Sequence, residues 1–194
     1  MSSKATNTSE SIAPVTGADL TRQRILEAAC HLFTSRGYRE TGVRDICAMA
    51  GVNQALVPRY FGSKLGLFEK VLFSLVDVTV FTDLERPQFG QALADAFCGS
   101  PAEAAMVVPT LLYAAGDSAA KDVALKVLHS SIIAPLEKWF GTADAEDRVA
   151  QVLVVVTGFY TYRLMLPLEP MQGKASNGVR EWLARTLQEI VDRP

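Results

Sequence analysis

The sequence predicts an all-α protein. Apolar residues recur at helical spacing both near the start of the chain, in residues 25–33, and near its end, in residues 179–191. Glycines, prolines and short Ser/Asn segments separate these periodic runs, and neither the alternation of a strand nor a hairpin signal competes with them. With 194 residues, of which 49% are apolar, the chain is long and apolar enough to bury a core.

The chain begins with a segment that does not look folded. Residues 1–17 are rich in Ser, Thr and Ala and hold few large apolar groups, which is typical of a disordered arm. Residues 18–36 then place five apolar side chains on one face, so we expect a helix that Gly37 ends. This helix would be the scaffold for the next two.

Residues 43–50 predict a short helix with Ile46, Met49 and Ala50 as its apolar stripe. Gly51 can adopt the left-handed backbone that stops a helix, and the turn continues through Val52. Two short helices joined by a tight Gly-containing turn are the unit that sets one helix in the major groove of DNA.

Asn53 is a favoured N-cap, so the second helix of this unit should run from Gln54 to about Tyr60. Val57 and Phe61 are four residues apart and should both face the core. Pro58 would then be the fifth residue of the helix, where it removes a backbone N–H bond and disfavours helical geometry just before it. We therefore expect a tightened or kinked recognition helix.

The segment RQRILEAACHLFTSRGYRETGVRDI followed by AMAGVNQALVPRYFGSK resembles the TetR family of bacterial transcriptional regulators. The resemblance covers residues 18–78 and rests on several motifs in order: an amphipathic helix, Gly-Tyr, Thr, a short helix, Ala-Gly-Val and an aromatic-Phe-x-Ser-Lys close. It implies a three-helix DNA-binding domain at 18–78 and a larger all-helical domain for effector binding and dimerisation at 79–194. Three departures are Pro58 for a usual Tyr, Leu65 for a frequent Glu and Cys47 for a usual Ala.

Side-chain chemistry and the resemblance together predict the DNA contacts. Arg can bond guanine O6 and N7, Gln can bond adenine N6 and N7, and Ala can contact a thymine methyl. Hydroxyl groups can donate to phosphates, and a Lys at a helix N-terminus adds to backbone N–H groups that already favour an anion. The predicted contacts are Thr41, Arg44, Gln54, Ala55, Arg59, Tyr60 and Lys64. An ordinary solvated surface is the alternative for each of them.

Charge is distributed unevenly along the chain. Residues 20–70 hold eight basic and four acidic side chains, a net +4, whereas residues 71–194 hold ten basic and fifteen acidic ones, a net −5. This asymmetry favours phosphate attraction at one end of a protein whose total charge is only −2. A merely solvated basic face would give the same count.

The following helices are assigned from caps and breaks. Ser63 should cap a largely buried helix that continues to about Phe81 and acts as a lever, with Gly66 either tolerated or a source of motion. A loop with a short helix near 88–97 comes next. Ser100, Pro101 and Glu103 then start a helix that stops at Gly116.

The last third of the chain predicts three more helices. One runs from about Ser118 toward Phe140 with an interruption at Pro135, one covers 144–166 and is apolar nearly all round, and one is amphipathic and ends near Val191. The last two can form a four-helix bundle with a second copy, which resembles the dimer interface of the family. The predicted interface residues are Val152, Val156, Gly158, Trp182, Leu183, Leu187 and Ile190.

The middle of the chain is rich in aromatic and Met side chains, which suit either an ordinary core or a pocket for an apolar effector. The resemblance favours a pocket. The predicted lining is Phe81, Phe97, Met106, Tyr113, Phe140, Phe159 and Arg163. Arg163 lies within an apolar helix, and we expect it to pair with an acidic effector or with Glu169 or another carboxylate.

Little in the sequence suggests an enzyme. His31 and His129 are its only histidines, and no nucleophile elbow, phosphate-binding Gly loop or pair of metal ligands accompanies them. Cys30, Cys47 and Cys98 lack metal spacing and are interpreted as buried apolar residues. We therefore expect no catalytic residue, metal or cofactor.

The sequence also predicts a cytoplasmic protein without a membrane partner. No secretory signal is recognisable, and the longest uncharged apolar run, residues 149–162, is too short to span a bilayer. The function that these observations favour is a regulator that binds a palindromic double-stranded operator as a homodimer, and that a hydrophobic or aromatic small molecule releases. A DNA-binding regulator without an effector is the alternative, and repressor or activator action stays open.

Overall fold

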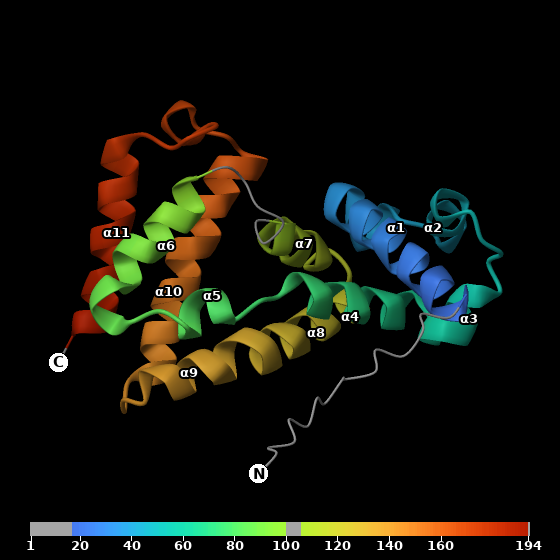
Figure 1. Cartoon of the computed structure of the whole chain (residues 1–194), viewed down its shortest axis with the longest axis horizontal. Coiled ribbons are helices and arrows are strands. Elements are labelled where there is room, and N and C mark those ends of the chain that lie inside the picture. The colour runs from blue at the N-terminus through green and yellow to red at the C-terminus, as the bar shows by residue number, and fades with distance from the viewer. Residues whose placement is uncertain (1–16, 100–105, 194) are drawn as a thin grey trace, which may run out of the picture.

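The computed structural model describes residues 17–99 and 106–193, and they confirm the all-α prediction because no strand occurs among them. The predicted N-terminal arm and the predicted helix start at Ser100 lie outside the described residues. Figure 1 shows α1, α2 and α3 grouped at one end, and α6, α10 and α11 packed at the other, with α4, α7 and α8 between them.

The first four helices are α1 (Gly17–Glu40), α2 (Val43–Ala50), α3 (Leu56–Phe61) and α4 (Lys64–Leu75). The predicted break at Gly37 is confirmed, since its φ of 80° interrupts α1 before a last turn. The α1 stripe from Ile25 to Phe33 packs with side chains of α2, α3 and α4 into one buried cluster. Met49 was predicted to join it but is 50% exposed, and Cys47 is buried in its place.

The end of α4 differs from the prediction. The helix stops at Leu75 instead of continuing to Phe81, because Val76 is extended and a separate turn, α5 (Thr79–Thr82), follows. The Asp77 carboxylate starts that turn: its Oδ1 accepts from the Thr79 N–H at 2.9 Å and from the Thr79 hydroxyl at 2.5 Å. β-branched residues and an Asp that can bond the nearby backbone both favour such a break.

Gly66 in the first turn of α4 has a clear steric role. A Cβ at this position would lie 2.2 Å from the carbonyl oxygen of Phe61. Only glycine allows α4 to start so close to the end of α3, so Gly66 is required and not merely tolerated, and its role in motion stays a prediction.

The remaining helices follow the predicted order with some changes. They are a short turn Arg86–Gln88, α6 (Phe89–Cys98), α7 (Val107–Ala114), α8 (Ser118–Leu128), α9 (Ala134–Phe140), α10 (Ala145–Tyr160), a turn Glu169–Met171 and α11 (Asn177–Asp192). The predicted interruption near Pro135 is a wide helical turn, His129–Ile133, just before α9. A similar wide turn, Thr161–Met165, extends α10.

A second buried cluster lies among α5, α6, α9, α10 and α11. α6 crosses α11 closely, since a Cβ on Gly90 would lie 2.1 Å from the Ala184 carbonyl oxygen. Gln188 of α11 locks this crossing by accepting from the Gly90 N–H at 2.9 Å and donating to the Arg86 carbonyl at 2.9 Å. Arg148, although charged, is buried and donates both to Asp144 and to carbonyls at the end of α11.

The two clusters meet through α7 and α8. Ala114, Ala120 and Val127 of these helices belong to the cluster of α1–α4. Lys126 of α8 also forms an ion pair of 2.8 Å with Glu69 of α4. Packing of α7 and α8 against α1–α4 thus crosses the predicted domain boundary at residue 78. That boundary stays a prediction.

Two further sequence interpretations concern metals and membranes. Cys47 and Cys98 are buried as expected, but Cys30 is only partly buried. Within 17–99 and 106–193, no group of His, Cys, Asp and Glu is arranged to hold a metal ion. None of the helices described there has both the length and the apolar character that crossing a membrane requires.

Candidate functional site

The helix-turn-helix has the predicted turn but a later second helix. Gly51 adopts the left-handed conformation at φ 65° and ends α2 as expected. Asn53 caps the next segment, with its Oδ1 accepting from the Ala55 N–H at 2.9 Å. The first helical residue is Leu56, however, two residues after the predicted Gln54. Gln54 and Ala55 therefore lie in the turn that enters α3.

This shift changes the role of Pro58. It is the third residue of α3, where the backbone N–H has no carbonyl partner within the helix. The expected kink is therefore wrong, since Pro58 here costs no hydrogen bond and its fixed φ suits the first turn. Its carbonyl accepts from the Gly62 N–H at 2.9 Å and closes the helix.

α3 is anchored by one fully buried side chain, Val57. Phe61, predicted to face the core equally, is only partly buried, with the Arg22 guanidinium 5.7 Å from its ring centroid. Pro58 and the predicted contacts Gln54, Ala55 and Arg59 are exposed. The short α3 thus presents most of its length to the outside.

Arg44 of α2 is exposed as well, and it lines one surface depression together with Gln54. The two side chains thus border the same depression although ten positions separate them in the chain. Arg59 lies one turn further along, with its guanidinium 5.9 Å from the Tyr60 ring centroid. Arg44 of α2, Gln54 and Ala55 of the turn, and Arg59 of α3 are all exposed, and we call these four residues the reading surface.

Thr41 does not belong to this surface. Its side chain is buried, and its hydroxyl donates to the Gly37 carbonyl at 2.7 Å and to the Leu32 carbonyl at 3.2 Å. The predicted phosphate contact of this hydroxyl is therefore wrong, because it already ties the start of α2 to the end of α1.

Lys64 begins α4, as predicted, after the Ser63 cap whose hydroxyl accepts from the Gly66 N–H at 3.0 Å. Its ammonium lies 4.1 Å from the ring centroid of Tyr38. Burial lowers the pKa of Lys64, while Asp117 and Glu40 act in the opposite direction. Lys64 and the partly buried Tyr60 are at the edge of the reading surface, and their DNA contacts stay predictions.

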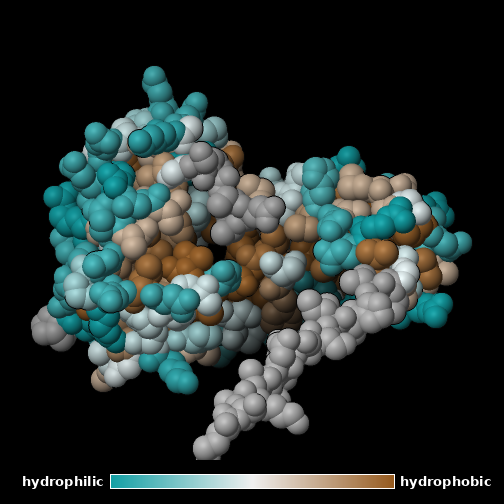
Figure 2. Space-filling view, viewed as in Figure 1, coloured by the Kyte–Doolittle hydropathy of each residue, from teal (hydrophilic) through white to brown (hydrophobic). Residues whose placement is uncertain are grey.

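A cavity lies between the two packing clusters, and its empty volume of about 680 Å³ includes solvent space at its mouth. Figure 2 shows apolar surface on both sides of a hollow in the middle of the molecule. The lining residues are Leu75, Val76, Asp77, Val80, Phe81, Phe97, Val107, Val108, Leu111, Leu128, Ile132, Leu153, Val156, Thr157 and Tyr160. The cavity therefore touches the end of α4, its break from α5, and α6, α7, α8 and α10.

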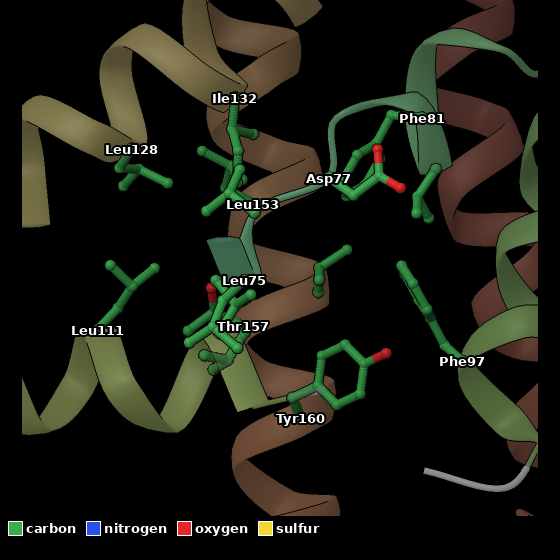
Figure 3. A pocket seen from close by; sticks show the side chains of 15 residues that line it. Leu75, Asp77, Phe81, Phe97, Leu111, Leu128, Ile132, Leu153, Thr157 and Tyr160 are labelled. Carbon is green, nitrogen blue, oxygen red and sulfur yellow. The ribbon is translucent and has the colours of Figure 1, made fainter. Parts of the chain in front are cut away.

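Figure 3 shows Asp77, Phe81 and Phe97 on one side of this cavity, across from Leu111 and Leu128. Burial raises the pKa of Tyr160 to about 12, so its phenol is protonated at neutral pH. The hydrogen bonds from the Thr79 hydroxyl and N–H lower the pKa of Asp77, so its carboxylate is ionised.

Only two of the predicted pocket residues, Phe81 and Phe97, line the cavity. Phe140 and Phe159 are buried in the second cluster, and Met106 packs against it. Tyr113 points out at 42% exposure. The missed lining of α10 consists of Leu153, Val156, Thr157 and Tyr160. Their spacing of i, i+3, i+4 and i+7 was available in the sequence as a helical face.

Two family models match this chain. The model described as "Bacterial regulatory proteins, tetR family" matches residues 25–71, which include α2 and α3. The model described as "Tetracyclin repressor-like, C-terminal domain" matches residues 88–191, more than half of the chain. The chain belongs to the TetR family.

Relatives agree with this assignment over part of the chain. The HTH-type transcriptional repressor Rv3405c of Mycobacterium tuberculosis is 46% identical over 80 residues, 41% of this chain and 40% of that protein. The HTH-type transcriptional repressor NicS of Pseudomonas putida is 34% identical over 84 residues, 40% and 39% of the two chains. The match therefore spans about two fifths of each relative's length.

Solved structures share the whole fold. A putative TetR-family transcriptional regulator from Rhodococcus sp. superposes with a TM-score of 0.71 at 14% identity, covering 89% of this chain and 99% of that one. Salmonella enterica GusR gives a TM-score of 0.69 at 20% identity, covering 91% and 96%. At such identities the likeness concerns the TetR-family fold alone.

Arg163 of this TetR-family chain does not line the cavity. It is buried, its Nη2 donates to the carbonyls of Gly99 and Gly173, and its guanidinium lies 5.7 Å from the Phe159 ring centroid. Within the described residues its Nε and Nη1 have no hydrogen-bond partner, and neither Glu169 nor another carboxylate pairs with it. The expected ion pair is therefore wrong, and backbone carbonyls hold this side chain instead.

The predicted dimer residues of the TetR-family chain also divide by burial. Five of them are buried in the subunit: Val152, Val156, Leu183, Leu187 and Ile190, of which Ile190 still lines the groove between α10 and α11. Trp182 is 47% exposed, and a Cβ on Gly158 would meet nothing within 4 Å. Val154, which the prediction omitted, is 72% exposed on α10 and lines a shallow groove between α10 and α11 with Thr186. The outward face of α10 thus includes a residue that the prediction missed, whereas that of α11 includes the predicted Trp182.

Proposed function

We propose that this protein is a transcriptional repressor that binds a palindromic operator as a homodimer and releases it when an apolar small molecule occupies the cavity. One observation carries the proposal: the cavity wall contains the end of α4, the helix on which the recognition helix α3 is mounted. The same chain therefore joins a reading surface to a cavity with an apolar lining.

DNA binding is supported by the chemistry of the reading surface. Arg44, Gln54 and Arg59 offer the groups that bond guanine and adenine edges, and Ala55 offers a methyl group for thymine. The basic excess of residues 20–70 supplies the attraction for phosphate. Tyr60 and Lys64, at the edge, are suited to backbone phosphates.

Dimer formation is supported by the outward face of α10 and α11. Val154 and Trp182 are large apolar side chains that are 72% and 47% exposed in the isolated chain. A two-fold partner presenting the same two helices would bury them in a four-helix arrangement. Such a dimer holds two recognition helices, which must be about 34 Å apart to enter successive major grooves.

Coupling follows from what the ligand would touch. Leu75 and Val76 are at the end of α4, and Leu111 is in α7, whose Tyr113 packs against Gly37 of α1. A ligand that binds better to one setting of these helices shifts their population by its difference in affinity. About 3 kcal/mol of such coupling lowers operator affinity roughly 150-fold.

Selection from random duplex DNA supplies an operator for the test. We expect a palindromic sequence, and we expect apolar compounds to weaken its binding to wild type in fluorescence anisotropy. Thr157→Phe should fill the cavity and abolish this response, whereas the nearly isosteric Thr157→Val should retain it. If compounds shown by calorimetry to bind leave operator affinity unchanged, the effector-free regulator is the correct function.

A further inference from the structure

We propose that the effector is a lipophilic cation, with an apolar body inside the cavity and a positively charged head group at Asp77. This inference rests on the proposed function, because it names the chemical class of ligand for the same cavity.

The first argument is the charge of the lining. Among the described residues that line the cavity, Asp77 is the only ionisable group charged at neutral pH, since the Tyr160 phenol stays protonated. All other lining groups are apolar side chains or the hydroxyl of Thr157. The described lining residues therefore present one negative charge and no positive one to a ligand, which favours a cation and opposes a carboxylate.

The second argument is the position of Asp77. Its side chain is exposed, so the carboxylate keeps its hydration while the cavity is empty and carries no burial cost. Both hydrogen bonds from Thr79 end on Oδ1, so they leave Oδ2 available to a head group at the mouth. The apolar body of the ligand then lies deeper, along the Leu and Val side chains.

The third argument is the row of aromatic rings beside this carboxylate. Phe81 follows Asp77 by four residues and lies in α5, its ring centroid is 6.3 Å from that of Phe97, and the Phe97 centroid is 5.2 Å from that of Tyr160. Figure 3 shows Asp77 and Phe81 on the side of the cavity where Phe97 stands. Ring faces attract quaternary and other weakly hydrated ammonium groups, so the carboxylate and the rings favour the same head group.

Asp77 also connects such a ligand to the helix that carries α3. Its carboxylate holds the first turn of α5 immediately after the α4 break. A cation that pairs with this carboxylate therefore contacts the connection between α4 and α5, whereas a neutral ligand contacts only the apolar side chains that line the cavity.

Three probes with the same tail test the charge: decyltrimethylammonium, decanol and decanoate, each below its micelle concentration, titrated calorimetrically into the full chain. A partly exposed ion pair and a cation–π contact together correspond to about a tenfold gain in affinity. We expect the ammonium probe to bind about tenfold more tightly than decanol, and decanoate to bind most weakly.

Asp77→Asn is the central variant, because its amide oxygen can still cap Thr79 while the charge is gone. It should remove the advantage of the ammonium probe and leave decanol unchanged. Asp77→Glu should restore the advantage. Asp83→Asn is the matched control, since Asp83 is an exposed carboxylate at the end of α5 that does not line the cavity.

The outcomes separate the two proposals. If decanol binds as tightly as the ammonium probe, if decanoate binds best, or if Asp83→Asn has the same effect as Asp77→Asn, the cation inference is overturned while the effector function stands. If none of the three probes binds wild type, both the inference and the effector role of the cavity are overturned. Binding of the ammonium probe that weakens operator affinity and depends on Asp77 supports both.

Discussion

Gly37 of α1 and Tyr113 of α7 lie so close together that a Cβ on Gly37 would be 2.9 Å from the Tyr113 Cβ. Gly37 also has a φ of 80°, a backbone conformation that residues other than glycine rarely adopt. The helix that supports the reading surface thus touches a helix of the cavity wall at a point where neither can be displaced without moving the other.

Gly37→Ala should therefore destabilise the protein by about 1–3 kcal/mol, as strain and overlap act together. Thermal and urea unfolding measure this change. Gly62→Ala is the matched control, because Gly62 has a φ of 76° but a Cβ there would meet nothing within 4 Å. An equal loss in the two variants would show that the Tyr113 contact contributes nothing.

Substitutions on the reading surface should separate sequence preference from general affinity. Arg44→Ala and Gln54→Ala should relax the preference for particular bases, because both remove groups that bond base edges. Repeating the selection from random duplexes with each variant measures this. A variant that loses affinity but keeps the full consensus would contradict the assigned role.

Lys64→Ala should instead weaken binding to all duplexes about equally and lower the salt slope by about one unit per subunit. Anisotropy titrations at several salt concentrations provide the slope. Lys174→Ala is the control, since Lys174 is exposed in the loop before α11. A changed base preference in Lys64→Ala would refute a phosphate contact.

Val154→Arg should convert the dimer to a monomer, because it places a charge on an apolar side chain that is 72% exposed and that we assign to the two-fold contact. Light scattering across a micromolar dilution series measures the mass. Leu125→Arg is the control, since Leu125 is 52% exposed on α8, outside that face. A dimer that survives Val154→Arg, or a monomeric wild type, would remove α10 and α11 from the interface.

Acid should weaken the contact between Asp144 and the buried Arg148. Hydrogen bonds from Arg148, and secondarily from Thr142, lower the pKa of Asp144 below its unfolded value of about 3.9. A lowered folded pKa contributes stability that is present above the unfolded pKa and is lost as pH falls through the folded one. Asp144→Asn should thus be less stable than wild type at pH 6, and the difference in melting temperature should shrink toward pH 2. A constant difference would mean that the charge of Asp144 does not contribute.

The sequence predicted best those elements whose ends carry local signals. The end of α2 follows from the left-handed backbone of Gly51, and the start of α4 follows from the Ser63 cap. Each of these ends is decided by residues within one turn. The break after Leu75 was missed because apolar periodicity continued across it to Phe81. There the Asp77 cap and a run of β-branched residues outweighed the apolar pattern.

Site residues were harder wherever a distant partner decides their role. Thr41 has the chemistry of a phosphate contact, yet its hydroxyl donates to the carbonyls of Gly37 and Leu32 at the end of α1. Arg163 looked like half of an ion pair, but the carbonyls that hold it come from Gly99 and Gly173. The cavity itself is the space that six helices leave between them, and spacing along one helix cannot show which of its faces borders that space.

The close approach of Gly66 to the Phe61 carbonyl allows two proposed properties, the choice of DNA sequence and the response to a ligand, to vary separately. The joint between α3 and α4 depends on backbone geometry, so the exposed side chains of Gln54, Ala55 and Arg59 can be exchanged while the mounting of α3 stays the same. Under the proposed function, substitutions at these exposed positions can thus change the operator while the response to the effector is kept. A change at position 66 itself would put both at risk together.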